Sequence, residues 1–413
     1  MKHRFLHNII RCLFLLPALL SVSCSREVED PDVPSGGEAT LNIGFKIPTR
    51  AAAGGYEDGE TDENYIDITG GNYRIYFFNT DNKFIASFDP YGFITADGND
   101  YRQYNVLGQA PDALVGHSTF KMVVLANWPK YPEDDANIPL KEGETTIADI
   151  CNASWAQYDC LTDGKTNPTS VALDPDAGRL MPFYGVHEYN DVTFKPGVAT
   201  ILPEPVTLLR AMAKVEVILQ TDDYFDLSFS SLKINRYNAT GYCAPKDVFH
   251  QDAYNHNDWE SDYTRNLHLV DDRNDSEAKE LSFRRVRRWD EGGKRYEKWT
   301  AYLPEYQNIE ASDAYSSIKA KFDIQTADDT PHTIYFAKYD GGKTDNGNDA
   351  NRLNIERNNI YRFQVTCTHY DFKLLLTVSD WQGLYENTFD FGDIQIVSPV
   401  SPWEDEKDND VEF

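Results

Sequence analysis

The chain is predicted to fold as an all-β protein of two tandem β-sandwiches with few short helices. Short segments that alternate polar and apolar residues follow one another, separated by Gly, Asn, Asp and Pro, as sandwich strands do. Tyr and Phe, which favour strands, occur 25 and 22 times, whereas Met occurs 4 times. At 413 residues, the chain is longer than one ordinary domain, so we expect two.

The first segment, residues 1–23, has the pattern of a secretory signal peptide. Lys2 and Arg4 form its cationic start, and residues 13–22 form its apolar run. The run ends at a loose lipobox, Ser-Val-Ser-Cys, which predicts a lipid on Cys24 and hence a membrane anchor. The following residues up to 37 are polar and acidic with Pro and Gly, as expected of a flexible tether.

Residues 40–47 form the first expected strand, because their polar and apolar side chains alternate. Four apolar side chains point to one face: Leu41, Ile43, Phe45 and Ile47. Burying each stabilises the fold by roughly 2 kcal/mol, so the four contribute about 8 kcal/mol, which is comparable to the stability of a whole domain.

A candidate cleavage site follows this strand directly. Arg50 precedes Ala51 and two more alanines, which makes the Arg50–Ala51 bond accessible to a trypsin-like protease. Residues 24–50 are therefore predicted to be an acidic tether and a removable strand. The alternative is that residues 41–47 form an ordinary first strand that is never removed.

The next segments predict the first sandwich, over residues 51–204. Residues 73–78 and 84–88 are expected to form a hairpin, since turn-forming residues separate them. Residues 120–126 are almost entirely apolar, as in a buried strand, whereas residues 132–158 are expected to be irregular. Further strands are expected at 192–202 and 206–219, and the proline pair between them, Pro203 and Pro205, marks the expected boundary.

The second sandwich is predicted over residues 205–386. Its expected strands are 232–234, 283–302, 318–324, 333–338, 360–368 and 372–378. One hairpin is unusually basic, with seven bases in 15 residues: Arg284, Arg285, Arg287, Arg288, Lys294, Arg295 and Lys298. These charges either protect a sheet edge from unwanted pairing or form a dock for an acidic neighbour, such as another copy of the chain.

Composition and motifs argue against several functions. The formal net charge of −28 repels nucleic acids and anionic membranes, so neither is an expected partner. The sequence holds no GxSxG, HExxH, P-loop or GxGxxG pattern, so we expect no enzyme, cofactor or metal. There is no CxxC pair. Cys151 and Cys160 could form a disulfide, whereas Cys243 and Cys367 are expected to be buried thiols.

Several short stretches together resemble the fimbrillin superfamily of Bacteroidetes pilins. They are LRAMAKVEV at 209–217, VVLANWP at 123–129, AYLPE at 301–305, RNNIYRFQV at 357–365 and VSDW at 378–381. The resemblance implies two transthyretin-like sandwiches. It also implies a lipoprotein that reaches the outer membrane and is cut after an arginine by a trypsin-like protease. The groove left by the freed strand is then filled by a neighbouring subunit through strand exchange.

This resemblance implies a stalk or tip subunit of a surface fimbria that supports adhesion, with an anchor subunit as a third possibility. Its partners would be other pilin subunits, the protease, the lipid anchor and a surface receptor. Residues 387–413 are the donor-strand candidate and acidic tail. Their apolar residues Phe389, Phe391, Ile394 and Ile396 change phase at Gly392-Asp393, so one strand can bury all four only with a bulge or turn.

The sequence also fits a second function. A surface lipoprotein that keeps its lipid anchor could bind glycans by stacking sugars on exposed aromatic rings. Its candidate platforms are Trp128, Trp155 and Trp259, although tryptophans of this kind are commonly part of a core.

Overall fold

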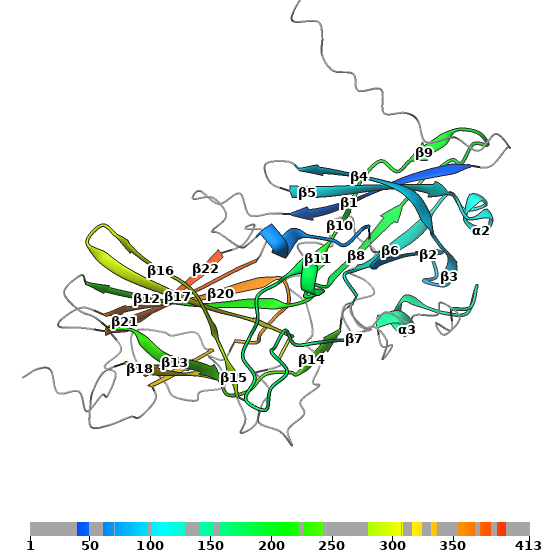
Figure 1. The fold of residues 1–413 in the computed structure, drawn as a ribbon. Helices are drawn as coiled ribbons and strands as arrows, with labels where there is room; N and C mark the ends of the chain where they lie inside the picture. Colours follow the sequence, from blue (N-terminus) through cyan, green and yellow to red (C-terminus); the bar gives the residue numbers. More distant parts are fainter. Residues whose placement is uncertain are drawn as a thin grey trace, which may run out of the picture.

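The computed structural model confirms the all-β class (Figure 1). It describes residues 39–48, 61–69, 71–97, 101–128, 140–151, 157–222, 227–242, 244, 280–306, 308, 316–323, 332–336, 353–367, 372–380 and 386–393. Within them the α-helices are α2 (Asp112–Val115) and α3 (Ile147–Cys151), and short 3-10 turns lie at η1 (Thr61–Asn64) and η4 (Pro175–Ala177).

Two five-stranded sheets enclose the first core. One has the order β10-β1-β5-β4, with β9 also paired to β1, and the other has the order β11-β8-β6-β2-β3. The strands of the first sheet are β1 (Thr40–Pro48), β4 (Pro90–Asp97), β5 (Tyr101–Gln109), β9 (Ala199–Ile201) and β10 (Val206–Thr207). Those of the second are β2 (Tyr73–Phe78), β3 (Phe84–Ser87), β6 (Phe120–Ala126), β8 (Phe183–Tyr189) and β11 (Leu209–Arg210).

Two further sheets enclose the second core, a six-stranded sheet β16-β17-β12-β20-β21-β22 and a four-stranded sheet β15-β13-β18-β19. The larger one contains β12 (Ala213–Asp222), β16 (Arg284–Glu291), β17 (Lys294–Leu303), β20 (Asn359–Cys367), β21 (Phe372–Asp380) and β22 (Glu386–Asp393). The smaller one contains β13 (Phe229–Ile234), β15 (Leu281–Ser282), β18 (Ser317–Phe322) and β19 (His332–Tyr335). Alternate residues of β12, among them Val215 and Val217, point into the core between them.

Several expected elements are confirmed. β2 and β3 form an antiparallel hairpin, and every residue of β6 is buried. β16 and β17 form the basic hairpin, whose turn glycines Gly292 and Gly293 both have positive φ, 59° and 72°. This is the conformation that tight two-residue hairpin turns require.

The expected strand at 192–202 is wrong for most of its length. Only β9, at its end, is a strand. Asp191 has a left-handed φ of 58°, and Pro196 has no amide hydrogen to donate to a ladder, so the chain cannot extend the sheet before Ala199.

Two segments cross between the two pairs of sheets. β10 and β11, which follow the proline pair, still pair with β1 and β8, and the switch to the second core falls between Arg210 and Ala213. Conversely, β7 (Gln157–Asp159) pairs with β14 (Thr240–Tyr242), and Cys160 lies in the second core.

The position of Cys160 corrects the possible disulfide with Cys151. Cys160 is a free, buried thiol whose Sγ lies 3.5 Å from the carbonyl oxygen of Tyr302, so its side chain points into the second core. Cys367 is also a free and buried thiol, as expected. Burial raises the pKa of both thiols to about 12, so neither is ionised near neutral pH.

Candidate functional site

β1, the strand expected to be removable, lies in the interior of its sheet. On one side it pairs antiparallel with β5 along its whole length, from Thr40 opposite Gln109 to Pro48 opposite Tyr101. On the other side it pairs in parallel with β9 near its start and with β10 near its end. We call this position, between β5 on one side and β9 and β10 on the other, the β1 seat.

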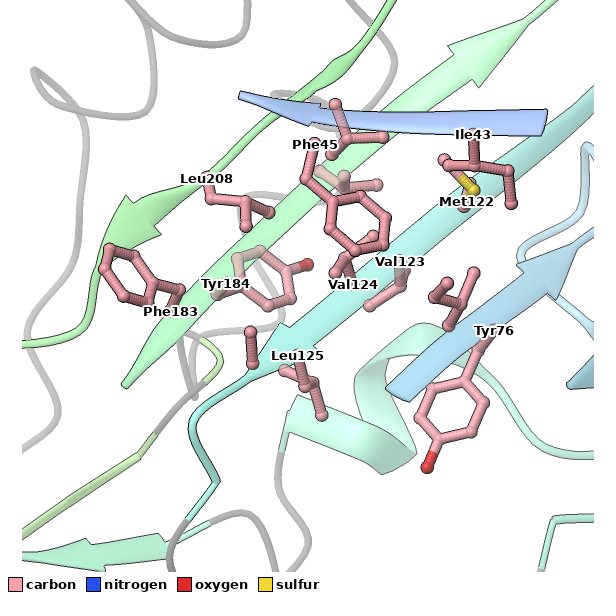
Figure 2. Packing of buried hydrophobic residues seen from close by; sticks show 14 of the residues in the cluster. Ile43, Phe45, Tyr76, Met122, Val123, Val124, Leu125, Phe183, Tyr184 and Leu208 are labelled. Atoms are coloured by element: carbon pink, nitrogen blue, oxygen red, sulfur yellow. The ribbon is translucent and has the colours of Figure 1, made fainter. Parts of the chain in front are cut away.

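The inward side of the β1 seat is closed to solvent. Leu41, Ile43, Phe45 and Ile47 are each 0% exposed. Figure 2 shows Ile43 and Phe45 pointing from β1 toward the side chains of β6 and β8. Phe45 also meets the ring of Tyr73 edge-on, with centroids 6.2 Å apart. The burial assumed in the sequence-based estimate is therefore complete at all four positions.

The outward side of the seat is narrow at one point. A Cβ atom at Gly44 would lie 3.0 Å from the Cβ of Pro205 and 3.2 Å from Oδ1 of Asn105. Because these contacts are tighter than ordinary van der Waals distances, glycine fits this position without a shift, whereas any other residue in a strand that replaces β1 in the same register requires its neighbours to move by a few tenths of an ångström.

The chain downstream of the expected cleavage site is held by its own contacts. Glu63, in η1, forms an ion pair with Lys214 (Nζ to Oε1, 2.9 Å) and accepts a hydrogen bond of 2.5 Å from the Tyr302 hydroxyl. Arg210, which is 1% exposed, donates to the Glu63 carbonyl oxygen and to Oδ1 of Asn64. Strands β11, β12 and β17 therefore all hold η1.

The residues just after η1 are bound to the first sandwich. The Tyr104 hydroxyl donates to the Asn64 carbonyl oxygen (3.0 Å) and accepts from the Ile66 amide (2.9 Å). Oδ1 of Asn127 accepts from the Asp67 amide, and its Nδ2 donates to the Tyr65 carbonyl oxygen. We call residues 61–68 the retained segment, because none of these contacts involves β1.

Sequence reasoning did not identify the retained segment or β5. The sequence feature that could have indicated the retained segment is Arg210, an arginine within the apolar stretch LLRAMA. A charged side chain flanked by buried residues needs polar partners from elsewhere in the chain. A local pattern could not show that these partners come from residues 63, 64 and 358.

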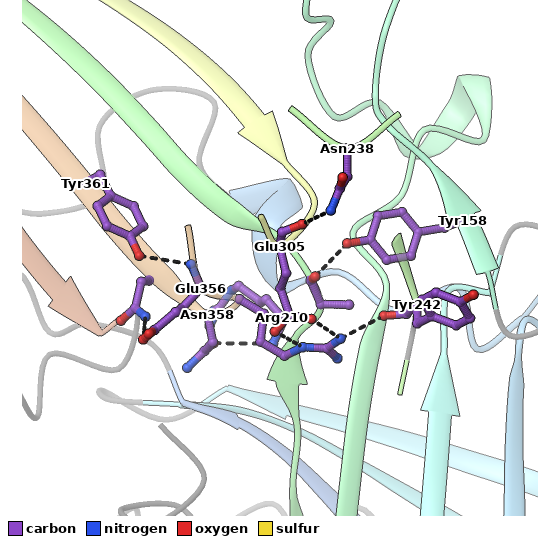
Figure 3. Close-up of polar contacts among 11 residues, drawn as sticks. Tyr158, Arg210, Asn238, Tyr242, Glu305, Glu356, Asn358 and Tyr361 are labelled. Atoms are coloured by element: carbon purple, nitrogen blue, oxygen red, sulfur yellow. Dashed lines mark hydrogen bonds and ion pairs between the residues drawn. The ribbon is translucent and has the colours of Figure 1, made fainter. Parts of the chain in front are cut away.

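Three of the stretches that carry the family resemblance, 209–217, 301–305 and 357–365, meet where the two sandwiches join (Figure 3). Arg357 binds Glu305 through two contacts, Nε to Oε1 at 2.7 Å and Nη2 to Oε2 at 2.8 Å, and also donates to the Tyr242 carbonyl oxygen. The side chain of Asn358 accepts from the backbone amide of Arg210. These motif residues therefore perform a structural task, since they satisfy buried polar groups at the junction.

A second buried charge cluster lies nearby, on the face of the six-stranded sheet that points away from the second core. Glu216 is 0% exposed and pairs with Lys214 at 3.1 Å, Lys298 at 2.7 Å and Arg362 at 2.7 Å. Burial alone would raise the pKa of Glu216, but the three cations hold the pKa of this carboxyl well below its usual range.

The remaining predicted site residues are only partly described. Cys24, Arg50, Ala51, Ile394 and Ile396 lie outside the described residues. Phe389 and Phe391 fall in β22, the edge strand that pairs antiparallel with β21. The register of this pair shifts between Asp390 and Asp393, where the apolar pattern of the sequence changes phase.

The basic hairpin lies at the other edge of the same sheet, with β16 outermost. Ion pairs of its bases include Arg288 with Glu297 (2.8 Å), Arg295 with Asp290 (3.4 Å) and Lys298 with Glu216 (2.7 Å). The guanidinium of Arg287 stacks over the Trp289 ring at 4.1 Å. Part of the positive charge is thus balanced within the hairpin and its neighbour β12.

One of the three tryptophans proposed as sugar-binding platforms is buried. Trp128 is 0% exposed and belongs to the first core, so it cannot stack on a sugar. Trp155 and Trp259 lie outside the described residues. Within the described part of the chain, no cluster of metal-ligating side chains is found, and no helix is long and apolar enough to cross a bilayer.

Comparison with known proteins gives fold-level similarity to solved structures only. No family model and no curated protein matches the chain. Among the similar structures is a candidate cell adhesion protein of Bacteroides uniformis, with 12% identity, a TM-score of 0.38 and coverage of 82% of this chain and 98% of that one. Another, from Bacteroides eggerthii, has 13% identity, a TM-score of 0.40 and coverage of 81% and 87%.

A third similar structure is the fimbrial anchor protein Mfa2 of Porphyromonas gingivalis. Its identity is 9%, its TM-score is 0.33, and the similarity covers 86% of this chain and 99% of that one.

Proposed function

We propose that this chain is a structural subunit, stalk or tip, of a fimbria on the cell surface. It is exported as a lipoprotein through Cys24, cut after Arg50 and assembled by strand exchange with subunits of the same or a related kind. The observation that supports this most directly is the position of β1. It fills an interior place in its sheet, yet it lies close before a candidate cleavage site.

Loss of β1 would leave an empty place that attracts a replacement strand. It would uncover the core face that four fully buried side chains now cover, and it would leave backbone groups of β5 without their ladder partners. Unpaired strand edges and exposed apolar surface both favour addition of a strand from another chain. The retained segment supports the same proposal, because the mature chain keeps its attachment to both sandwiches after the cut.

The proposed donor lies near the C-terminus. Because Phe389 and Phe391 belong to a strand that already pairs with β21, we place the donor beyond Asp393, where Ile394 and Ile396 alternate with polar or smaller residues. Deleting residues 394–413 would leave β22 in place and should abolish polymers. Unchanged polymer ladders after this deletion would remove the donor assignment.

The cleavage step has a matched pair of variants. Arg50→Gln should block processing and leave monomers that begin at Cys24, because a trypsin-like protease needs the basic side chain. Arg26→Gln makes the same change in the tether and should leave the mature N-terminus at Ala51. N-terminal sequencing and gels run without boiling report both results. Ladders of normal length from the Arg50→Gln protein would contradict the proposal.

A further inference from the structure

The six-stranded sheet carries a basic surface that faces away from the second core. Val215 and Val217 point into that core. Lys214 and Glu216, which alternate with them on β12, therefore lie on the opposite face, and so do the residues of adjacent strands that are paired with Lys214 and Glu216. On strands β16, β17, β12 and β20 the bases of this face are Arg284, Arg287, Lys294 and Arg362, with the buried Lys214 and Lys298, and the acids are Glu216, Asp222 and Glu291. By register, β21 and β22 add Lys373 and the acids Glu386, Asp390 and Asp393. The excess of positive charge is therefore confined to the part of the face formed by β16, β17, β12 and β20, in a chain whose net charge is −28.

The hairpin end of this face holds an aromatic pair as well. Trp289 and Tyr296 lie opposite each other on β16 and β17, and their rings stack at 4.9 Å with an interplanar angle of 11°. Arg287 covers the Trp289 ring, and the partly exposed Arg362 lies on β20. We call Arg284, Arg287, Lys294 and Arg362, with these two rings, the basic face.

The end of β22 is aligned with the basic face. Ladder pairs connect them in one row, from Asp393 through Lys373, Thr366, Gln220 and Tyr296 to Trp289. Five interstrand steps of ~4.8 Å span about 24 Å. The ten residues 394–403 carry no charge, and a fully extended segment of that length reaches about 33 Å.

The next residues of the chain complement the basic face in charge. Residues 404–412 contain six acidic side chains and one lysine. They begin after a linker that is long enough to cross the sheet. Attachment through this linker gives an effective local concentration on the order of mM, so ion pairs that are individually weak suffice for binding.

We propose that the basic face binds the acidic segment 404–412 of the same chain. The contact lays residues 394–403 across the outer surface of the sheet. If these residues are the donor, a point that rests on the function proposed above, the contact keeps the donor on its own subunit until the β1 seat of a neighbour is empty.

A zero-length cross-link tests this contact in the uncut monomer. The full chain from residue 24, with Cys24→Ser to prevent lipidation, is prepared in light and 15N-labelled form, mixed, and treated with a carbodiimide that joins carboxylates to lysine. We expect links between Lys294 and residues 404–412 that are only light–light or heavy–heavy, and that disappear at high salt. Absence of the link at low salt would overturn the proposal, and so would mixed light–heavy links.

Charge-reversal variants separate a specific contact from general attraction. Arg284→Glu with Arg287→Glu should lower the yield of the link about tenfold, because each reversal replaces an attraction with a repulsion. The control is Lys141→Glu with Lys165→Glu, which changes the same amount of charge at lysines that are 69% and 75% exposed and lie outside the basic face. An equal loss in the control would show that only net charge matters.

A second variant avoids any effect on folding of the sheet. Glu404→Gln, Asp405→Asn and Glu406→Gln together should lower the link yield as the arginine reversals do. No change in yield would contradict the proposed partner. The readout needs neither cleavage nor polymers, so it can fail while the proposed function holds. It can also succeed if the Arg50→Gln protein still forms ladders, the result that contradicts the proposed function.

Discussion

Phe45 and Glu216 are both fully buried, but they stabilise the protein in different ways. Phe45 fills space between two sheets, so its contribution depends on volume and apolar area. Glu216 is a carboxylate among three cations, so its contribution depends on charge and therefore on pH. The sequence predicted the burial of Phe45 from alternation. It did not predict that of Glu216, whose partners come from three different strands.

Phe45→Ala in the uncut protein should lower the free energy of unfolding by about 3–5 kcal/mol, because it leaves a cavity under β1. Asn42→Ala, on the outward side of the same strand, should change it by less than about 0.5 kcal/mol. Urea denaturation measures both. Equal effects of the two substitutions would contradict the packing of the Phe45 side of β1, and not its Asn42 side, against the core.

Glu216→Gln should destabilise the protein at neutral pH by about 3–5 kcal/mol, because three cations lose their buried partner. The pKa of Glu216 is lowered on folding, so its contribution is complete above the unfolded pKa of about 4.3 and is lost as the pH falls toward the folded pKa. The difference in unfolding free energy between native and variant proteins should therefore shrink below about pH 4. Glu144→Gln, at a 71% exposed surface pair, is the control and should have little effect. A pH-independent difference for Glu216→Gln would contradict the charge argument.

At the scale of elements, β1 and the retained segment are held by different interactions, although about a dozen residues separate them in the chain. They share β5, whose backbone pairs with β1 and whose Tyr104 side chain binds the backbone of Asn64 and Ile66. β1 is held by its ladder to β5, β9 and β10, whereas residues 61–68 are held by Tyr104, Asn127, Arg210 and Lys214. Alternation was enough to predict that residues 40–47 form a strand. Its neighbours could not be predicted, because β5 lies about 60 residues away and β9 and β10 about 160, and local patterns do not encode such pairings.

Removal of β1 should therefore change the two regions differently. After a cut between residues 48 and 61 and release of the N-terminal peptide in mild denaturant, hydrogen exchange should accelerate in β5. Amides of the retained segment, such as those of Ile66 and Asp67, should stay protected, because their acceptors remain. Tyr104→Phe should remove the protection of Ile66. Equal acceleration in both regions would show that the retained segment depends on β1.

At the scale of the whole molecule, the motif residues explain how one chain joins two sandwiches. Arg210, Glu305, Arg357 and Asn358 satisfy each other or nearby backbone groups at the junction. Composition and strand spacing predicted two all-β units. They did not predict that β10 and β11 stay with the first unit or that β7 reaches β14 of the second, because these crossings depend on tertiary packing.

The junction should be sensitive to loss of one partner of its buried ion pair. Glu305→Gln leaves the Arg357 guanidinium buried without a carboxylate, which should lower the free energy of unfolding by about 3–5 kcal/mol. Calorimetry of the monomer measures this loss. The exposed pair of Lys233 and Glu280 provides the control, because Glu280→Gln should have an effect below about 1 kcal/mol.

The most direct test of the account is a cut that occurs only after residue 50. Residues 49–52 are replaced by the recognition sequence of a specific protease, and a scrambled sequence serves as the uncut control. After cleavage and release of the peptide that contains β1, mass photometry should show the monomer converting into a ladder of multimers, while the control stays monomeric. The account would be contradicted if the cut protein loses residues 39–48, remains folded and stays monomeric.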